Sequence, residues 1–418
     1  MGSKIKLLVC GESANAHSIA GYAASRGIFD VKAFVLDEEK AELWNQAMEE
    51  SQFILRFKKD DGDTSELRST LELTEFHARA CVTTQDVIVL ATPSSEHEKY
   101  LTAMQPYIPS GAVLVGMPSG PGFEFQCWDI LKEKFFTCNI VSCDVAPWEG
   151  KIVEYGKIVE VLRSEKVVNG AIMNHCRPRK PPFLALQMLF GSKPSFKPSA
   201  SFLEVTIMSD FLRTFYPVIL HAVWRYYHSP LHVNPPLFHG ISTDGASMAF
   251  SLSEELQGLA RALAFLKKSF NKTAIINLHK WLILHYGDEI EDDTSTYSCL
   301  TTNAAFKDIM QPMCETGAGR FIPDYDTPYM TDDLVNGLCV IRGIADLANV
   351  PLPSVDDVIV WCQQKTGKEY LIRGKFRGKD IASTRAPQRY NITTFDGMFL
   401  TKNNVPHRDF TRGASAPN

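Results

Sequence analysis

The stretch from residue 7 to residue 26 most strongly constrains the fold of this chain. A short apolar run, Leu7 to Cys10, ends abruptly at Gly11, and small residues then lead into an alanine-rich helical pattern from Ser18 to Arg26. Strand, tight turn and helix in this order open a dinucleotide-binding βαβ unit. The helix dipole favours an anion above the first helical amides. We therefore expect an α/β fold with a Rossmann-type N-terminal domain.

The glycine fingerprint of that unit is degenerate in this chain. Gly11, Ser13 and Ala16 occupy the three positions of Gly-x-Gly-x-x-Gly/Ala. The middle glycine normally lets the backbone approach a pyrophosphate, so a serine there leaves two interpretations open. In the first, the turn binds NAD through Gly11, Ser13, Ala14, Asn15 and Ala16. In the second, it is an ordinary βα turn that binds no nucleotide.

Further candidate cofactor residues follow the next apolar runs. Asp37 stands about 20 residues past the glycine turn, where an acid binds the ribose hydroxyls and favours NAD over NADP. The same residue is also placed to cap the helix expected from Glu38 to Glu49. Thr92 and Pro93 directly follow the buried run Val87 to Ala91. They are therefore expected at the sheet edge that faces the ligand in open α/β folds.

Length and composition indicate two domains. The 418 residues exceed what one compact core usually holds, and a Pro/Ser/Lys-rich stretch from Gly191 to Ser199 reads as a linker. We predict a Rossmann-like NAD-binding domain at residues 1–198, an all-α domain at 199–400 and a polar tail at 401–418. The second domain is expected to open with one continuous buried helix from Phe202 to Tyr227, and a further helix is expected from Asp332 to Ala348.

Charge and cysteine usage exclude several classes of protein. The net charge of −5 argues against a nucleic-acid surface. The ten cysteines lack metal-binding spacing, and neither a signal peptide nor a membrane span is visible, which favours the cytoplasm. His279 and His285 are six residues apart and do not share a helix face, so we predict no metal.

Five strings spread between residues 21 and 390 carry a resemblance to a known family. They are Gly21-Tyr22-Ala23-Ala24-Ser25-Arg26, Gly122-Phe123-Glu124-Phe125-Gln126-Cys127, Thr301-Thr302-Asn303, Gly367-Lys368-Glu369-Tyr370-Leu371 and Arg385-Ala386-Pro387-Gln388-Arg389-Tyr390. Together they resemble the opine dehydrogenases, the octopine and tauropine type of marine invertebrates. The resemblance implies a Rossmann domain, a helical second domain and a cleft between them.

The implied activity is that of an NAD-dependent oxidoreductase acting on CH–NH bonds. In this family, pyruvate and an amino acid condense to an imine, and NADH delivers hydride to it. The resemblance therefore implies NADH as cofactor and a 2-oxo acid and an amino acid as small-molecule substrates. Members of the family are often monomeric, and the sequence leaves the oligomeric state open.

Several positions that the family uses for catalysis have changed. The family pairs a catalytic His with an Asp and binds a substrate carboxylate with an Arg. Tyr216 stands at the His position, in a segment about two residues longer than the family's, and Pro328 stands at the Arg position. Asp333 remains at the Asp position. By resemblance, Asp333 and Tyr216 are therefore the candidate catalytic residues.

The loops that follow the strands differ from the family in the same way. Gly120 stands where the family has a substrate-binding Gln, and Asp144 and Val145 stand where it has a Glu-Thr pair. By resemblance, Asp144 joins the candidate catalytic residues, and Gly120 and Val145 are the candidate substrate residues.

Two hypotheses about function remain after these substitutions. The first is an opine-dehydrogenase-type oxidoreductase with an altered site. A relocated proton donor could then be His221, His228 or His232, and a relocated cation Arg213 or Arg320. The second is a catalytically degenerate member that binds a nucleotide or metabolite, or a non-enzymatic binding protein on the same fold.

Overall fold

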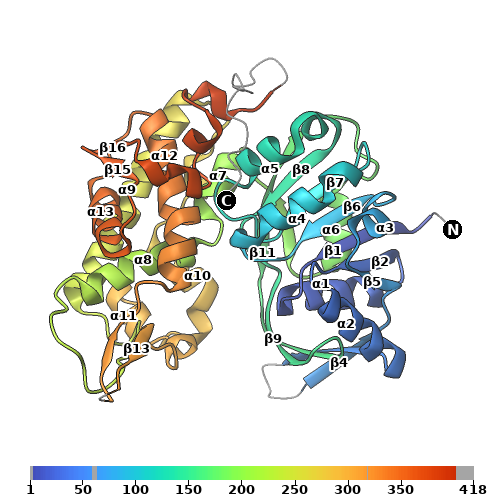
Figure 1. The fold of residues 1–418 in the computed structure, drawn as a ribbon, viewed down its shortest axis with the longest axis horizontal. Coiled ribbons are helices and arrows are strands. Elements are labelled where there is room, and N and C mark those ends of the chain that lie inside the picture. Colours follow the sequence, from blue (N-terminus) through green and yellow to red (C-terminus); the bar gives the residue numbers. More distant parts are fainter. Residues whose placement is uncertain (1–2, 59–63, 318, 402–418) are drawn as a thin grey trace, which may run out of the picture.

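The computed structural model describes residues 3–58, 64–317 and 319–401, and shows two domains side by side (Figure 1). The first domain is built on an eight-stranded sheet in the order β12-β11-β8-β7-β6-β1-β2-β5. Its neighbouring strands pair parallel, except that β11 runs antiparallel to β8. This doubly wound sheet confirms the Rossmann-type prediction.

The sheet strands have the following bounds: β1 (Ile5–Cys10), β2 (Phe29–Phe34), β5 (Leu73–Glu75), β6 (Val87–Leu90), β7 (Val113–Gly116), β8 (Asn139–Cys143), β11 (Val167–Asn174) and β12 (Ser195–Pro198). The helices of this domain are α1 (Ala14–Ser25), α2 (Glu38–Glu50), α3 (Ala78–Val82), α4 (His97–Met104), α5 (Phe123–Leu131) and α6 (Pro182–Phe190). A smaller sheet in the order β4-β3-β10-β9 comprises β3 (Phe53–Lys58), β4 (Thr64–Ser69), β9 (Trp148–Glu154) and β10 (Ile158–Ser164).

Both faces of the large sheet are covered, which explains the continuous apolar run in its first strand. Leu7 and Val9 belong to the hydrophobic cluster on one face, and Leu8 and Cys10 belong to the cluster on the other. Strands buried on both sides read as unbroken apolar runs rather than as alternating ones. The opening stretch of the sequence therefore forms the strand that the pattern predicted.

The Pro/Ser/Lys-rich stretch is not a simple linker. Ser195–Pro198 forms β12, which pairs parallel with β11. The pairing starts with Val167 opposite Ser195 and ends with Gly170 opposite Pro198. β12 is the edge strand of the sheet, and an edge strand tolerates proline because one of its sides needs no backbone donor. The boundary between residues 198 and 199 stays a prediction, since α7 beyond it still packs against β8 and β11. Of the predicted tail 401–418, residues 402–418 lie outside the described part of the chain.

The second domain is mainly helical, as predicted. Its helices are α7 (Phe202–Met208), α8 (Phe211–Trp224), α9 (Thr243–Leu266), α10 (Leu278–Tyr286), α11 (Thr296–Thr301), α12 (Cys339–Leu347) and α13 (Pro353–Thr366). Two short hairpin sheets accompany them: β13 (Met313–Glu315) with β14 (Phe321–Pro323), and β15 (Leu371–Ile372) with β16 (Lys375–Phe376). None of the helices in the described ranges is long and apolar enough to span a bilayer.

Two helical predictions need correction. The single helix expected from Phe202 to Tyr227 is broken into α7 and α8, because Ser209 is extended and Asp210 adopts a left-handed conformation with φ of 49°. The helix expected from Asp332 onward instead begins with a π-helical segment, Tyr329–Leu338, that continues into α12. Such wide turns are frequent at functional sites.

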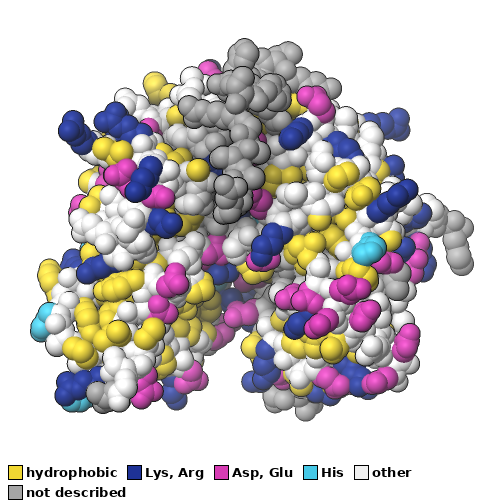
Figure 2. All heavy atoms as spheres, in the orientation of Figure 1, with side chains coloured by type: hydrophobic (Ala, Val, Ile, Leu, Met, Phe, Trp, Pro, Cys, Tyr) yellow, Lys and Arg dark blue, Asp and Glu magenta, His cyan; other side chains and the backbone are white. Residues whose placement is uncertain are grey.

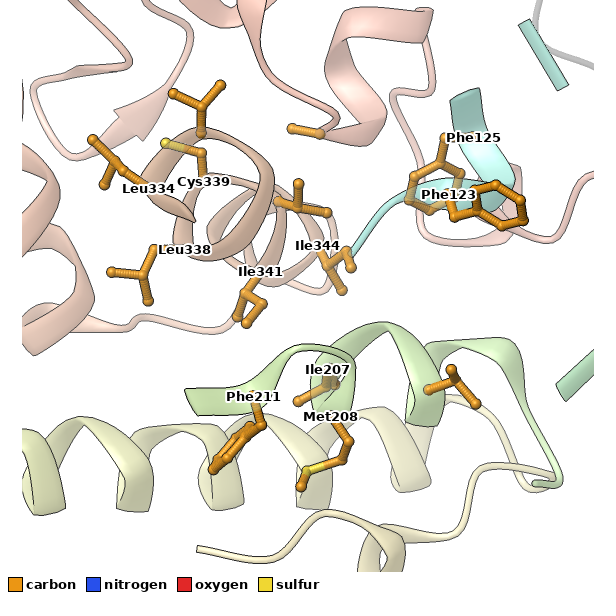
Figure 3. Close-up of a cluster of buried hydrophobic side chains, with 14 of the residues drawn as sticks. Phe123, Phe125, Ile207, Met208, Phe211, Leu334, Leu338, Cys339, Ile341 and Ile344 are labelled. Atoms are coloured by element: carbon orange, nitrogen blue, oxygen red, sulfur yellow. The ribbon is translucent and has the colours of Figure 1, made fainter. Parts of the chain in front are cut away.

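One hydrophobic core joins the two domains. Phe123 and Phe125 of α5 lie near Ile344 of α12, while Met208 and Phe211 approach the same cluster from α7 and α8 (Figure 3). A large apolar contact of this kind holds two domains in a fixed relation on the side where it lies. The two domains are therefore held in a fixed relation on the side of this apolar contact.

Candidate functional site

Two cavities of about 650 Å³ each meet at the turn that precedes α1. The first lies beyond the carboxyl ends of β1, β2 and β6 and is lined by Glu12, Ser13, Asp37, Thr92 and Pro93. The second lies between the domains and also begins at Ser13. Figure 2 shows the molecule hollowed between the two domains, with acidic and basic side chains along the hollow. The two cavities give a dinucleotide one space for each of its halves, on either side of a helix N-terminus.

The turn itself is shaped by Gly11 and Ser13. Gly11 has φ of +125°, and a Cβ there would lie 2.6 Å from Cγ2 of Thr92. Ser13 is the N-cap of α1: its hydroxyl accepts a hydrogen bond from the amide of Ala16 at 3.2 Å and donates one to the carbonyl of Ala91 at 2.8 Å. Its hydroxyl is therefore used within the protein. The remaining amides of the first turn, those of Ala14 and its successor, have no partner inside the helix.

The neighbouring candidate residues are fixed by hydrogen bonds of their own. Nδ2 of Asn15 donates to the carbonyl of Met117 at 2.8 Å, which ties α1 to the loop after β7. Oδ1 of Asp37 accepts from the amide of Lys40 at 3.0 Å, so Asp37 caps α2 and lines the first cavity at once. Glu12 is exposed beside it, where its carboxylate would repel a pyrophosphate.

Aromatic side chains form the second-domain wall of the cleft. Tyr216 of α8 stacks on Tyr329 with ring centroids 4.3 Å apart, and Trp281 and Tyr286 of α10 line the same cavity. Burial raises the pKa of Tyr216 well above its ordinary value. Its hydroxyl therefore stays protonated at neutral pH and can serve as a hydrogen-bond donor.

Asp333 lies behind this wall and is paired with an arginine. Nε of Arg213 is 3.0 Å from Oδ1 of Asp333, and Arg213 itself lines the cleft. Oδ2 of Asp333 is buried and has no hydrogen-bond partner within the described ranges. Burial raises the pKa of Asp333 to about 7, although the guanidinium of Arg213 opposes that rise. Arg213 stands one turn before Tyr216 on α8, so the same helix brings both the arginine and the tyrosine to the side of Asp333.

The remaining sequence candidates lie behind the cavity surface or at its edge. Asp144 accepts hydrogen bonds from the backbone and side-chain amides of Asn169 at 2.9 and 2.7 Å, and burial raises its pKa to about 6. Val145, the next residue, lines the cleft. Gly120 donates from its amide to Oγ of Ser209 at 2.9 Å and packs so closely on Ser94 that a Cβ would clash with it.

Of the relocated donors and cations considered from the sequence, Arg213 is the one found in the cleft. His221 lies against Trp361 within the helical domain, with ring centroids 5.1 Å apart and the rings tilted by 46°. His228, His232 and Arg320 are outside the lining of the cleft, and His228 and Arg320 are exposed. Within the described residues, no three His, Cys, Asp or Glu side chains are placed to hold a metal ion.

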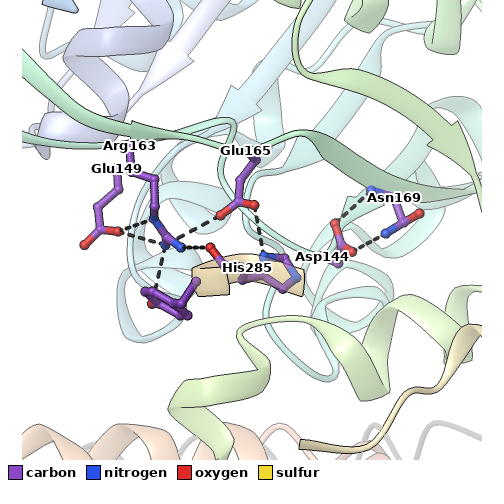
Figure 4. Close-up of polar contacts among 7 residues, drawn as sticks. Asp144, Glu149, Arg163, Glu165, Asn169 and His285 are labelled. Carbon is purple, nitrogen blue, oxygen red and sulfur yellow. Dashed lines mark hydrogen bonds and ion pairs between the residues drawn. The ribbon is translucent and has the colours of Figure 1, made fainter. Parts of the chain in front are cut away.

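Sequence reasoning missed a polar bridge across the cleft (Figure 4). Arg163 of β10 donates to the carbonyl of His285 at 2.9 Å, and its guanidinium lies 4.2 Å from the ring centroid of Tyr286. Nδ1 of His285 is 2.9 Å from Oε2 of Glu165, and Arg163 also pairs with Glu149 at 2.9 Å. No motif marks these residues, because the partners are about 120 positions apart and meet only in the fold.

Known proteins share this architecture over nearly the whole chain. Residues 216–366 match the family described as NAD/NADP octopine/nopaline dehydrogenase, alpha-helical domain. The chain is 34% identical over 409 residues to an opine dehydrogenase of Haliotis discus hannai, and the match covers 95% of this chain and 99% of that protein. It is likewise 34% identical over 400 residues to an octopine dehydrogenase of Pecten maximus, with 95% and 99% covered.

Solved structures give the same picture. A structure of octopine dehydrogenase with NADH and L-arginine superposes with a TM-score of 0.88 at 34% identity, covering 97% of this chain and 100% of that one. A structure with NADH and pyruvate superposes with a TM-score of 0.86 at 33% identity and the same coverage.

Proposed function

The chain belongs to the opine dehydrogenase family, and on that premise we propose that it catalyses the NADH-dependent reductive condensation of pyruvate with an amino acid. The observation that carries the proposal is the Arg213–Asp333 ion pair, set in the wall of the cleft that begins at Ser13. By resemblance, Tyr216 and Pro328 stand at the family's His and Arg positions, and this pair supplies a cation and a titratable carboxyl in their place.

The residues around the two cavities fit NADH. Gly11, Ser13, Ala14, Asn15 and Ala16 place the N-terminus of α1 between the cavities, where a pyrophosphate is favoured. Asp37 faces the first cavity with its second carboxylate oxygen available for ribose hydroxyls, and Thr92 and Pro93 form the adjoining wall. Bound NADH supplies the hydride.

The chain's own side chains then divide the remaining work. Arg213 binds the oxo-acid carboxylate through its terminal nitrogens while its Nε stays on Asp333. Asp333, whose pKa is raised to about 7, holds the proton that the product nitrogen needs. Tyr216 donates a hydrogen bond toward the cleft, and the aromatic wall around it excludes water. Asp144 positions Val145 through its hydrogen bonds to Asn169, and Gly120 leaves room beside Ser94 for the substrate loop.

We also propose that the protein acts in the cytoplasm. All ten cysteines are unpaired, as is usual where thiols are kept reduced.

The test follows the loss of NADH absorbance with pyruvate and a panel of taurine, glycine, alanine, β-alanine and arginine. We expect turnover with at least one amine, and we expect Arg213→Gln to abolish it. The matched control is Arg320→Gln, which removes an exposed guanidinium outside the cleft and should leave turnover intact. Turnover that survives Arg213→Gln contradicts the assignment of the cation.

A second outcome would favour a different function. Tyr216 and Tyr329 stack where the family's catalytic His would stand, which is the specific observation in favour of a member that binds without reacting. Calorimetric binding of NADH without turnover for any amine would identify the protein as a nucleotide-binding, non-catalytic member of the family.

A further inference from the structure

Asp210 occupies a strained position at the floor of the cleft. It precedes α8 with φ of 49° and ψ of 39°, a left-handed conformation that costs free energy for any residue with a Cβ. Its amide donates to the carbonyl of Asp144 at 3.0 Å, which fixes this conformation from the first domain. The residue lines both the large cleft and a small pocket that shares Arg213 with it. A strained residue in a cleft points to a function for its side chain.

The carboxylate of Asp210 has no hydrogen-bond partner among the described residues, although the charge of Arg213 acts on it. It does not serve as a side-chain cap for α8 although it stands at the N-cap position. The two neighbouring carboxylates differ in this respect. Asp333 is paired with Arg213 at 3.0 Å, and Asp332 accepts from Nδ2 of Asn336 at 2.5 Å. Asp210 is therefore the one carboxylate of this group that faces the cleft without a bonded partner among the described residues.

Charge and spacing define what would complete the site. The small pocket is lined by three carboxylates, those of Asp210, Asp332 and Asp333, and by the guanidinium of Arg213, while the buried guanidinium of Arg385 also acts on Asp210 and Asp332. Burying unpaired negative charge is costly, so a cation in the cleft is favoured. Arg213 stands three residues after Asp210, on the same side of the first turn of α8, and both residues line the cleft.

We propose that Asp210 is the specificity-determining residue that binds the ammonium group of the amino-acid substrate. The ammonium donates charge-assisted hydrogen bonds to this carboxylate, while the acid group of the same substrate lies toward the first-turn amides of α8, which leaves Arg213 to the oxo acid. The class of ligand is a zwitterion with adjacent or nearly adjacent amino and acid groups. The inference rests on the proposed function for its place in a reaction, but its test is a binding measurement that needs no turnover.

The experiment measures binding to the full-length, NADH-saturated protein by calorimetry. Each amino compound is compared with the acid that lacks its amino group: alanine with propionate, and taurine with ethanesulfonate. We expect the amino compound to bind roughly tenfold more tightly in the better pair, the size expected for one charge-assisted contact. In Asp210→Asn this ratio should fall to about one, whereas the Kd of NADH should change less than about twofold.

The variants are chosen so that the backbone is preserved. Asparagine and glycine both accept the left-handed conformation, so Asp210→Asn and Asp210→Gly remove the charge without adding strain. Asp332→Asn is the matched control, because it removes a neighbouring carboxylate that does not line the cleft, and its ratio should equal that of the unchanged protein.

Each outcome decides the proposal. An equal ratio in the unchanged protein and both Asp210 variants overturns it, and so does the absence of any preference for the amino compounds or of any binding at all. An ammonium preference that Asp210→Asn abolishes supports it, even if no amine is turned over. That last result would contradict the proposed catalysis while leaving the ammonium site in place.

Discussion

The two candidate catalytic residues, Tyr216 and Asp333, differ in whether they can exchange a proton near neutral pH. Burial keeps the phenol of Tyr216 protonated, whereas burial brings the pKa of Asp333 to about 7. Of the two, Asp333 is therefore the group that titrates near neutral pH. Arg213 lies against it and keeps its charged form from becoming still less favourable.

This raised pKa predicts a specific pH dependence of stability. The carboxyl of Asp333 binds its proton up to about pH 7 in the folded chain but only up to about pH 4 when unfolded. Its stabilising contribution is complete below about pH 4 and is lost as the pH rises through 7, at a slope of at most about 1.4 kcal/mol per unit. Asp333→Asn should remove that slope.

Urea unfolding followed by circular dichroism between pH 4 and 8 measures the effect. The free energy of unfolding of Asp333→Asn, relative to the unchanged protein, should increase with pH across this window. Asp288→Asn serves as the control, since the side chain of Asp288 is 94% exposed. Parallel pH curves for Asp333→Asn and the unchanged protein would contradict the assignment.

Among the elements, the loop from β7 to α5 connects the cofactor side of the sheet with the C-terminal part of the chain. Arg385 is fully buried beneath it and donates from Nη2 to the carbonyl of Ser119 at 3.1 Å. Gly122 ends the loop with φ of +78°, and a Cβ there would lie 2.4 Å from the carbonyl oxygen of Arg385. The loop can adopt this path only because glycine stands at its last position.

Gly122→Ala is therefore expected to destabilise the protein by about 1–3 kcal/mol, the cost of a side chain in the left-handed region at a close backbone contact. Thermal unfolding followed by circular dichroism measures the loss. Gly287→Ala is the matched control, because Gly287 has φ of −51° and no atom lies within 4 Å of its added Cβ. Equal melting temperatures for the two variants would show that the loop can relax.

The elements that the sequence predicted are those whose cause is local. The strand, turn and helix from Leu7 to Arg26 follow from a short run of residues. Ser13 and Asp37 line the first cavity, as expected, because each directly follows or caps such a local element. The break between α7 and α8 depends on a hydrogen bond from Asp210 to Asp144, which a periodicity of apolar residues cannot reveal. The edge strand β12 was missed because its prolines read as a linker.

The same limit applies to the site. The substitutions that the resemblance implies at the family's catalytic positions, such as Pro328 at the Arg position, could be read from single residues. The pairing of Arg213 with Asp333 joins residues 120 positions apart, so its existence required the packing of α8 against the π-helical segment. The sequence offered Arg213 as one of two cations and could not choose between them.

At the scale of the whole molecule, two different kinds of contact join the domains on the two sides of the cleft. The apolar block around Phe123, Phe211 and Ile344 joins the domains on one side. On the other, the contact is polar and partly exposed, through Arg163 and His285. Apolar burial depends on area and changes little with small motions, whereas single polar contacts can open and reform. The polar side is therefore where we expect the domains to separate.

Arg163→Gln should loosen that side. The variant loses the hydrogen bond to the carbonyl of His285 and the cation–aromatic contact with Tyr286, worth together about 1 kcal/mol, and the KM for NADH should rise roughly fivefold. Small-angle scattering of the NADH-bound protein should show a larger radius of gyration. Arg56→Gln is the control, since Arg56 pairs with Glu66 at 2.9 Å inside the same small sheet and touches no part of the second domain that the structure describes. If Arg163→Gln left both the KM for NADH and the radius of gyration unchanged, a different contact would have to hold the two domains together on this side.

The burial of Arg385 also has a consequence for how the protein folds during its synthesis. Ser119 leaves the ribosome 266 residues before the side chain that holds its carbonyl. A nascent chain can pair the strands on either side of that loop early, yet the loop itself waits until Arg385 has been made. Premature termination between α13 and Arg385 would thus release a chain whose large sheet is complete and whose β7–α5 loop lacks the arginine that holds it.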